Sequence, residues 1–417
     1  MSLDRAAVLA AWADARWARL ALRSRCDVER RQARLWRRMA AVVARTPAVA
    51  RLAGRPLADF PIVEPGELRR DFARWNTLGL RREQAEAAAA DSEAGGAGKV
   101  ADGIVAGFST GTAGARGVFV SGPAERARYI GQALGKLLPA TALLRSWRIA
   151  LVLRADNRLY RDVEGAGRFR FRFFGLDLAG ADLAPALAAF DPHVLIAPAH
   201  VLADLARWSE GDPFLPRLER LFWGAEPMGP AERAWIADAL GRRPDPIYQA
   251  TEGFLGAPCA HGALHLNEDA LVVELEPVEG VARFRPIVTD LYRTSQPMIR
   301  VRLDDLIEPL AGSCPCGSPL RAIAPIEGRA SDVWRWPDRI ACPREVEAAV
   351  ETVVGPSPWQ AEAFAAGVDL WLEPDLDPGA EAAAVAALQA LSGRPVTVRR
   401  VTPPRDGPKR RRVRWRP

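Results

Sequence analysis

Apolar and polar positions along residues 108–248 follow two periods that predict strands and helices in turn. The short apolar runs that predict buried strands are 149–153, 193–197 and 221–223, and the segments with helical spacing are 124–138, 199–208 and 230–240. Strands that alternate with helices are typical of an α/β domain with a substantially parallel sheet. Ligands of such sheets gather where the carboxyl ends of strands open into loops. The segments after residues 108, 223 and 248 are therefore candidate ligand-binding loops.

The pattern differs on either side of this region. Residues 1–90 are dominated by helical spacing, with apolar side chains among arginines and alanines. Residues 262–310 are β-rich, and residues 333–417 combine helices and strands on a smaller scale. We therefore predict an α/β protein with mixed and parallel sheets. Its large N-terminal domain would cover residues 1–328, and a small α+β domain would cover residues 329–417.

Composition is typical of a globular protein with a sizeable core. The 417 residues are 49% hydrophobic and 26% charged, and no apolar run approaches the length of a membrane span. Charged residues begin at Asp4 and Arg5, which argues against a secretory signal. Five cysteines, an odd number, favour a reducing compartment over a disulfide framework. We expect a cytoplasmic protein without a membrane partner.

The net charge of +6 comes almost entirely from arginine. Lys99, Lys136 and Lys409 are the only lysines, a bias typical of a GC-rich genome, so the arginine excess does not predict a nucleic-acid partner. Where composition replaces lysine by arginine, a retained lysine is a candidate for a site that needs a compact, flexible ammonium group.

Small hydroxyl residues and glycines are concentrated in the stretch Ser109-Thr110-Gly111-Thr112-Ala113-Gly114-Ala115-Arg116-Gly117. Glycines allow backbone N–H groups to turn toward an anion, and the hydroxyl groups with Arg116 would complete a phosphate cradle. Taken alone, such a run is more typical of a flexible hairpin connection. It also lacks the Gly-Lys-Ser/Thr ending of a Walker A loop.

Four further segments carry side chains suited to a nucleotide and its metal ion. They are Tyr248 to Glu252, Thr289 to Asp305, Gly328 with Arg329, and Pro404 to Arg410. An aromatic ring can stack on a base, a hydroxyl group can contact phosphate, and a carboxylate can hold Mg²⁺ or both ribose hydroxyls. Each segment occurs easily by chance, so none of them identifies a site alone.

Together and in this order, the five segments resemble those of the adenylate-forming superfamily of acyl- and aryl-CoA synthetases. The phenylacetate-CoA ligase and coenzyme F390 synthetase branch is the most similar, and the resemblance runs from about residue 60 to the end of the chain. It implies a large N-terminal domain that binds ATP and a carboxylate. It also implies a small, mobile C-terminal domain that swings about residue 332.

The resemblance implies a set of nucleotide contacts. The stretch from Ser109 to Gly117 corresponds to the family's phosphate loop, with Arg116 near the position of its terminal lysine. Tyr248 would stack on the adenine, and Asp305 would hold the ribose. The segment implied to lie along the adenine is Gly224-Ala225-Glu226-Pro227.

The resemblance also implies the catalytic residues. Thr251 would contact the α-phosphate, Glu252 would bind Mg²⁺, and Arg329 would lie close to the ribose. Lys409 corresponds to the C-terminal lysine that stabilises charge during adenylation, which fits its status as one of three lysines. The alternative for this end of the chain is a basic tail, which Arg410 to Arg414 would supply.

The implied reaction is attack of a carboxylate oxygen on the α-phosphorus of ATP, with loss of pyrophosphate. The acyl- or aryl-adenylate would then be captured by a thiol of CoA or of a carrier protein, without a covalent enzyme intermediate. The alternatives are adenylyl transfer of the F390 synthetase type, amide formation without a thioester, and a non-catalytic nucleotide- or RNA-binding protein. The identity of the acid and the oligomeric state do not follow from the sequence.

One region departs from the family pattern. The family places a basic residue and then glycine a few positions past the hinge, in a loop that lines the thiol tunnel. Residues 333–338 contain Trp334 and Trp336 and no glycine. The two indole rings either narrow that tunnel, which puts CoA as the acceptor in doubt, or pack between the domains.

Four residues form a candidate zinc site. Cys259 and His265 are separated by five residues, and Cys314 and Cys316 by one residue. Three thiols and an imidazole suit tetrahedral structural Zn²⁺. Gly317, directly after the second pair, would allow a tight turn that points both sulfurs at one ion.

The resemblance supports this site, because relatives in the same branch carry similar Cys, His and Cys-x-Cys positions that can hold zinc. His261 is a competing ligand, and reduced core cysteines are the alternative reading. Cys26 and Cys342 are expected to play no part.

Overall fold

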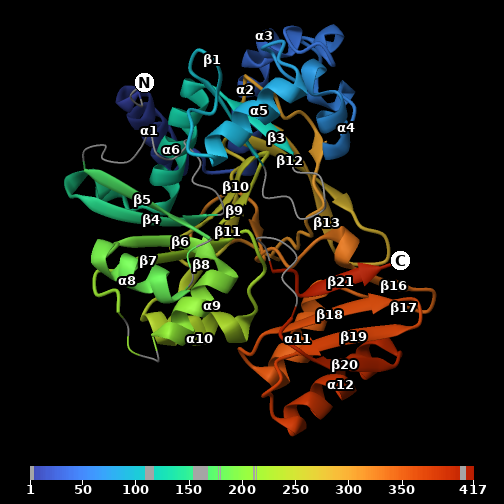
Figure 1. The fold of residues 1–417 in the computed structure, drawn as a ribbon. Coiled ribbons are helices and arrows are strands. Elements are labelled where there is room, and N and C mark those ends of the chain that lie inside the picture. Colours follow the sequence, from blue (N-terminus) through green and yellow to red (C-terminus); the bar gives the residue numbers. More distant parts are fainter. Residues whose placement is uncertain are drawn as a thin grey trace.

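A computed structural model describes residues 4–108, 117–153, 168–176, 178, 180–209, 212, 214–403 and 410–417. Its N-terminal part, coloured blue to yellow in Figure 1, is much the larger. The last strands and helices, in orange and red, lie together below it. Residues 334–416 are called the C-terminal unit below.

A five-stranded parallel sheet lies at the centre of the N-terminal part. Its strands, in spatial order, are β5 (Phe169–Gly175), β4 (Trp147–Leu153), β6 (Val194–Pro198), β7 (Arg220–Gly224) and β8 (Pro244–Pro246). The prediction of an α/β protein with a parallel sheet is confirmed. Three of the apolar runs in the sequence lie in β4, β6 and β7, where both faces of the sheet are covered.

Helices cover the two faces of this sheet. On one face, α8 (Gly180–Phe190), α9 (Ala199–Trp208) and α10 (Pro230–Leu240) pack against side chains such as Ala150 and Leu195. On the other face, α6 (Pro123–Leu137) packs against Ile149 and Val194. The sheet is therefore the middle layer of three.

The N-terminal helices surround α6 and the adjoining sheets. They are α1 (Arg5–Ala21), α2 (Arg25–Arg38), α3 (Ala40–Ala44), α4 (Pro65–Arg70) and α5 (Arg82–Glu93). The helix α1 packs closely against α6 because Gly131 and Gly135 have no side chain. A Cβ atom on Gly131 would lie only 2.3 Å from the carbonyl oxygen of Val8.

Three antiparallel sheets complete the N-terminal part. One contains β1 (Lys99–Ala101), β2 (Ile104–Phe108) and β3 (Val118–Ser121). The second contains β9 (Tyr248–Ala250), β10 (Gly253–Pro258), β11 (Leu264–Leu266) and β15 (Ala322–Ile323). The third contains β12 (Leu271–Pro277), β13 (Phe284–Asp290) and β14 (Val301–Arg302). Side chains of the second and third sheets share one hydrophobic core.

The C-terminal unit follows the 3₁₀ turn η5 (Ala330–Asp332). Its hairpin is β16 (Trp334–Trp336) and β17 (Arg339–Ala341), and its helices are α11 (Pro343–Val354) and α12 (Pro378–Ser392). Its main sheet has the order β20 (Val396–Arg400), β19 (Gly367–Leu372), β18 (Trp359–Phe364) and β21 (Val413–Arg416). The unit has its own hydrophobic core. The predicted boundary at residues 328 and 329, and the mobility of the unit, stay predictions.

Trp334 and Trp336 belong to that core. Their side chains are 0% and 4% exposed, and their indole N–H groups donate to the carbonyl oxygens of Arg414 and Phe364. The two rings meet edge to face, and Trp336 meets Trp415 in the same way. The two tryptophans therefore pack inside the C-terminal unit, which corrects both expectations, a narrowed thiol tunnel and packing between the domains.

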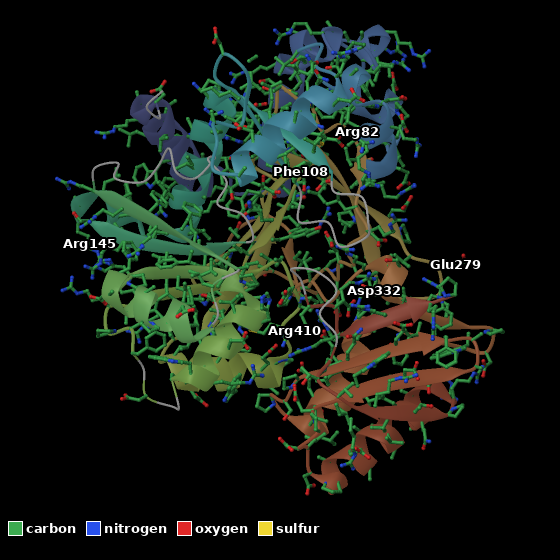
Figure 2. The ribbon with its side chains drawn as sticks, viewed as in Figure 1. Arg82, Phe108, Arg145, Glu279, Asp332 and Arg410 are labelled. Carbon is green, nitrogen blue, oxygen red and sulfur yellow. The ribbon has the colours of Figure 1, made fainter. Side chains whose placement is uncertain are left out.

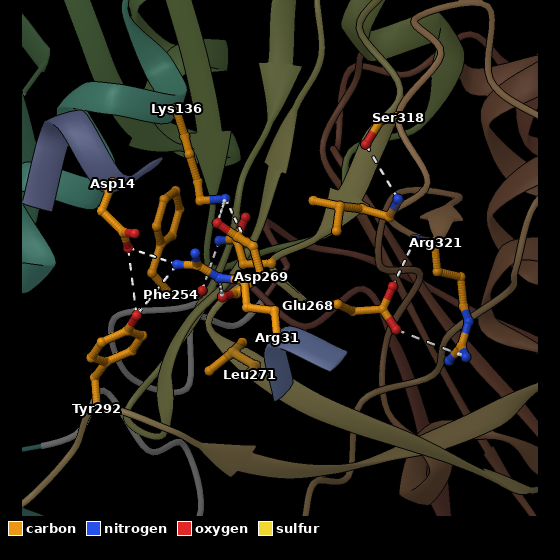
Figure 3. A network of polar contacts seen from close by, with 12 residues as sticks. Asp14, Arg31, Lys136, Phe254, Glu268, Asp269, Leu271, Tyr292, Ser318 and Arg321 are labelled. Atoms are coloured by element: carbon orange, nitrogen blue, oxygen red, sulfur yellow. Dashed lines mark hydrogen bonds and ion pairs between the residues drawn. The ribbon is translucent and has the colours of Figure 1, made fainter. Parts of the chain in front are cut away.

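A buried polar network joins α1 and α2 to α6 (Figure 3). Lys136 on α6 donates to both carboxylate oxygens of Asp269, at 2.7 and 2.9 Å. Arg31 on α2 contacts the carbonyl oxygen of Asp269 at 2.6 Å and the Asp14 carboxylate at 2.7 Å. Lys136 is thus a structural lysine, whereas Lys99 is exposed on β1. Within the described residues, no helix has both the length and the apolar character needed to cross a membrane.

Candidate active site

A cavity of about 770 Å³ lies at the carboxyl ends of the parallel strands. Its size is typical of a site for a small molecule or cofactor. The predicted site residues that line it are Gly224, Ala225, Glu226, Pro227, Tyr248, Thr251, Glu252, Asp305 and Arg329. These residues come from separate segments of the sequence, and the fold brings them to one place.

Two predicted elements, Ser109 to Arg116 and Lys409, lie outside the described residues. The strands that flank the first of them pair as a hairpin, with Phe108 opposite Val118. Phe108 and Phe119, on the two flanking strands, line the cavity. A phosphate-binding role for the stretch stays a prediction.

Tyr248 and Asp305 contact each other directly. The Tyr248 hydroxyl donates to the Asp305 carboxylate at 2.6 Å. Burial, with the nearby Asp305 charge, raises the pKa of Tyr248 well above its ordinary value, so the hydroxyl keeps its proton. Asp305 also forms a backbone bridge to Arg329, which links this pair to the segment just before η5. Three residues predicted from three separate segments thus lie side by side.

Thr251 and Glu252 form the turn between β9 and β10. The Arg293 guanidinium donates to the Thr251 carbonyl oxygen and fixes the turn. Gly253 follows with a φ of 153°, and a Cβ atom there would lie 3.1 Å from the Asp290 carboxylate. Burial raises the pKa of Asp290, which also lines the cavity, to about 6. The turn therefore presents its side chains at the edge of a site that already holds a buried carboxyl group.

Glu226 anchors the segment that follows β7. Its carboxylate lies 2.7 Å from His200 Nδ1, and accepts hydrogen bonds from the backbone N–H groups of His200, at 3.1 Å, and Arg410, at 2.7 Å. Burial alone would raise the pKa of Glu226, but the His200 hydrogen bond and the Arg410 charge outweigh it and lower that pKa. Ala225 before it adopts a φ of 70°, a left-handed conformation that few non-glycine residues adopt. The carboxylate thus joins this segment to the residue that follows Lys409.

Arg410, Arg411 and Arg412, just before β21 (Val413–Arg416), lie between the N-terminal part and the C-terminal unit. Figure 2 shows Arg410 and Asp332 at this junction. Arg410 contacts both carboxylate oxygens of Glu232 on α10, at 2.8 and 3.0 Å, and Arg411 contacts Asp332. Arg412 contacts Glu232 at 2.8 Å. The expectation of a basic tail is wrong for these arginines, because buried carboxylates neutralise them.

A second group of side chains in the junction comes from α11. Glu351 contacts Arg412, and Glu347 lies one turn before it and lines the cavity. The sequence analysis did not single out Glu232, Glu347 or Glu351. Glutamates on helices are most often exposed. The only hint in the sequence is that Glu347 and Glu351 are four residues apart on α11 and so share one face of the helix.

The four candidate zinc ligands come together beside β10 and β11, with Cys259 just after β10 and His265 in β11. One ligand atom from each of Cys259, His265, Cys314 and Cys316 lies within 4.8 Å of all the others. The Sγ atoms of Cys259 and Cys314 are 3.8 Å apart, and Cys316 Sγ is 3.4 Å from His265 Nε2. His265 Nδ1 lies 2.8 Å from the Leu320 carbonyl oxygen, which leaves Nε2 to face the sulfurs. The cluster fits a tetrahedral ion.

The remaining candidates lie outside this cluster. His261 is exposed and does not belong to the group, and neither do Cys26, which is exposed, and Cys342, which is buried. Gly317 has a φ of 71°, and its backbone N–H donates to the Cys314 carbonyl oxygen at 3.0 Å. This is the tight turn that the Cys-x-Cys-Gly sequence predicts.

No family model matches the chain, and no curated protein sequence matches it either. Solved structures do match. A 2-hydroxyisobutyryl-CoA ligase in the postadenylation state, in complex with 2-HIB-AMP, has a TM-score of 0.65 at 19% identity, over 92% of this chain and 87% of its own. The same ligase in an open conformation with 2-HIB-AMP and CoA has a TM-score of 0.51 at 19% identity, over 89% and 83%.

An amide bond synthetase also matches. The protein is McbA from Marinactinospora thermotolerans, with a TM-score of 0.53 at 15% identity, over 73% of this chain and 67% of its own. At such identities a likeness shows the fold alone. The chain therefore has the mixed α/β fold of the adenylate-forming ligases.

Proposed function

We propose that the protein is an ATP-dependent ligase that activates a carboxylic acid as an acyl-adenylate and transfers the acyl group to a thiol. The observation that carries this proposal is the convergence of Tyr248, Glu252, Asp305 and Arg329 on one cavity. They come from three separate segments, each of which the resemblance assigns to the same nucleotide. A chance match of short motifs would scatter these residues over the fold.

The proposed roles follow from the chemistry of each side chain. Asp305 accepts the ribose hydroxyls, with the Tyr248 hydroxyl holding its carboxylate in place. The Thr251 hydroxyl donates a hydrogen bond to the α-phosphate. Glu252 holds Mg²⁺, which when bound neutralises phosphate charge. Hard oxygen donors at the cavity fit this ion, since Glu252 and Asp290 both line it.

Lys409 stabilises the charge that develops when the carboxylate attacks the α-phosphorus. Support for this role comes from its neighbour, because the Arg410 N–H is bound by Glu226 at the cavity. A flexible ammonium group is the chemistry that this step needs, and the described contact of Arg410 with Glu226 is what supports assigning it to Lys409. Positioning and electrostatics then supply the rate, and pyrophosphate leaves.

ATP–pyrophosphate exchange with a panel of carboxylic acids tests this proposal. Exchange should depend on one class of acid, and Glu252→Gln and Lys409→Ala should each slow it by roughly a hundredfold or more. The matched controls are Glu279→Gln and Lys99→Ala, both at exposed positions, which should exchange like the wild type. No exchange with any acid, while ATP still binds, would contradict the adenylation reaction.

The acceptor is tested separately. CoA, a carrier-protein thiol and simple amines would be added to the preformed adenylate, and the product would be identified by mass. A thioester is the expected product. An amide would mean that an amine takes the acyl group in place of the thiol, with AMP leaving and the first step unchanged. A product carrying the adenylyl group, with the acid released, would instead favour adenylyl transfer.

We also propose that Cys259, His265, Cys314 and Cys316 hold a structural Zn²⁺. Three thiolates and a neutral imidazole provide a closed tetrahedral set, and burial lowers the pKa of His265, which favours that neutral form. Purified protein should contain about one equivalent of zinc. Cys316→Ser should lose most of it and Cys26→Ser none, whereas a metal-free wild type would end this proposal.

A further inference from the structure

The cavity has a second, apolar half beyond the residues assigned to the nucleotide. Its floor is one face of the parallel sheet. Strand register places Phe171, Ile149 and Val194 in one row across β5, β4 and β6. A second row contains Phe173, Leu151 and Ile196, and all six residues line the cavity.

The opposite wall is one face of α6. Tyr129, Ala133 and Leu137 are spaced by four residues, so they lie along the same stripe of the helix, and all three line the cavity. The stripe is about 12 Å long, at 1.5 Å per residue. Phe254 meets Tyr129 edge to face at 6.2 Å and extends the wall on β10. The sheet rows and this stripe together are called the apolar chamber.

Charged groups near the chamber are engaged with the protein. Glu125 accepts the backbone N–H groups of Thr294 and Ser295, at 2.5 and 2.7 Å. Arg126 donates to the carbonyl oxygens of Gly103 and Ser121, each at 3.0 Å, and Arg128 contacts Asp14 of α1; both arginines are on α6 and line the cavity. A charged group on a ligand tail would therefore lose its hydration beside charged side chains of α6 that already have partners in the protein.

We infer that the acid activated at this site has an elongated, uncharged hydrocarbon tail that fills the apolar chamber, and that Ala133 sets how far the tail reaches. Ala133 is the smallest side chain of the α6 stripe and lies between Tyr129 and Leu137. A bulky residue there would close the chamber half-way along its length. This inference rests on the proposed function, because it names the substrate class of the same site.

Exchange kinetics with a straight-chain series from acetate to decanoate test the inference. The value of kcat/KM should rise roughly fourfold per methylene until the chamber is full. Suberate, which has the length of octanoate with a second carboxylate at its far end, should react at less than about a hundredth of the octanoate rate. A preference for acetate, or equal use of suberate and octanoate, would overturn the inference.

Two variants locate the tail. Ala133→Phe should move the optimum to a shorter acid, and Ala124→Phe, at an exposed position in the first turn of α6, should leave the profile unchanged. If the two variants have equal thermal stability, a change in the profile of Ala133→Phe comes from the filled chamber and not from misfolding of the protein. An unchanged profile in stable Ala133→Phe would remove that residue from the inference.

Direct binding separates this inference from the proposed function. Calorimetry with octanoate and suberate needs no turnover, and octanoate alone should bind. If octanoate binds selectively and no acid supports exchange, the inference about the apolar chamber is supported and the proposed adenylation reaction is contradicted. If exchange occurs only with short or doubly charged acids, adenylation stands and the chamber assignment fails.

Discussion

Replacing Glu347 by glutamine removes a carboxyl group that the junction between the two parts of the molecule holds in its neutral form. Glu347 is 6% exposed. Burial, together with the carboxylates of Glu351 and Glu232, raises the pKa of Glu347 to about 8 against the opposing charges of Arg412 and Arg344. At neutral pH, the proton on Glu347 keeps a third negative charge out of a cluster in which two arginines face two glutamates.

The size of the effect follows from proton linkage. Because the folded pKa of Glu347 lies above the ordinary value of 4.5, the folded state binds more protons between these two pH values. The stability linked to this group is fully present below pH 4.5 and is lost as the pH rises toward 8. The loss amounts to about 1 kcal/mol at pH 5, about 3 kcal/mol at pH 7 and about 5 kcal/mol at pH 9.

Urea unfolding of the wild type and Glu347→Gln at these three pH values checks the prediction. A glutamine amide does not titrate, so the variant should gain about 4 kcal/mol relative to the wild type between pH 5 and pH 9. Any constant cost of burying the amide cancels in this difference. Glu279→Gln, an exposed control, should show no such trend. A difference for Glu347→Gln that stays within about 1 kcal/mol over this range would refute the reasoning.

Three further predictions concern other contacts. Glu232→Gln removes the carboxylate charge that Arg410 and Arg412 share. We expect the free energy of unfolding, measured in urea, to fall by about 3 kcal/mol and ATP–pyrophosphate exchange to be slower. A chelator should lower the melting temperature of the wild type but not that of Cys316→Ser, which differential scanning calorimetry can measure. Gly131→Ala should lower the free energy of unfolding by about 1 to 3 kcal/mol, because the added Cβ would clash with the Val8 carbonyl oxygen. Unchanged stability would mean that α1 can shift away from α6 without cost.

The fold was predictable because its signals are local. The apolar runs 149–153, 193–197 and 221–223 describe strands with both faces covered, and the helical repeats between them describe helices with one buried face. Thiol and imidazole groups have few other uses in that combination, so the Cys–His cluster was also visible in the sequence. Such patterns need no knowledge of which distant segments meet.

The junction was not predictable for the opposite reason. Arg410 and Arg412 look like a basic tail, because Glu232, the carboxylate they share, is 178 residues before Arg410 in the chain. Glu351 is a further partner of Arg412, 61 residues before it. Sequence spacing carries no signal for contacts of this range, so a run of charge is read as solvated by default.

Lysine scarcity proved an ambiguous signal. Lys136 is retained because it pairs with Asp269 in a buried network, where a compact ammonium group fits, and this is a structural use. The same scarcity argument supports Lys409 as a catalytic residue, which stays a prediction. A lysine in an arginine-rich chain therefore points to a position that needs an ammonium group. It does not tell a structural use from a catalytic one.

The central claim, that a carboxylate oxygen attacks the α-phosphorus of ATP, is tested most directly by isotope transfer. Octanoate whose carboxylate oxygens carry a heavy isotope would be incubated with the protein, ATP, Mg²⁺ and a thiol acceptor, and the mass of the AMP would be measured by mass spectrometry. An acyl-adenylate leaves one carboxylate oxygen on phosphorus, so the AMP should carry one heavy atom. Unlabelled AMP, or ADP with labelled phosphate, would contradict adenylate formation.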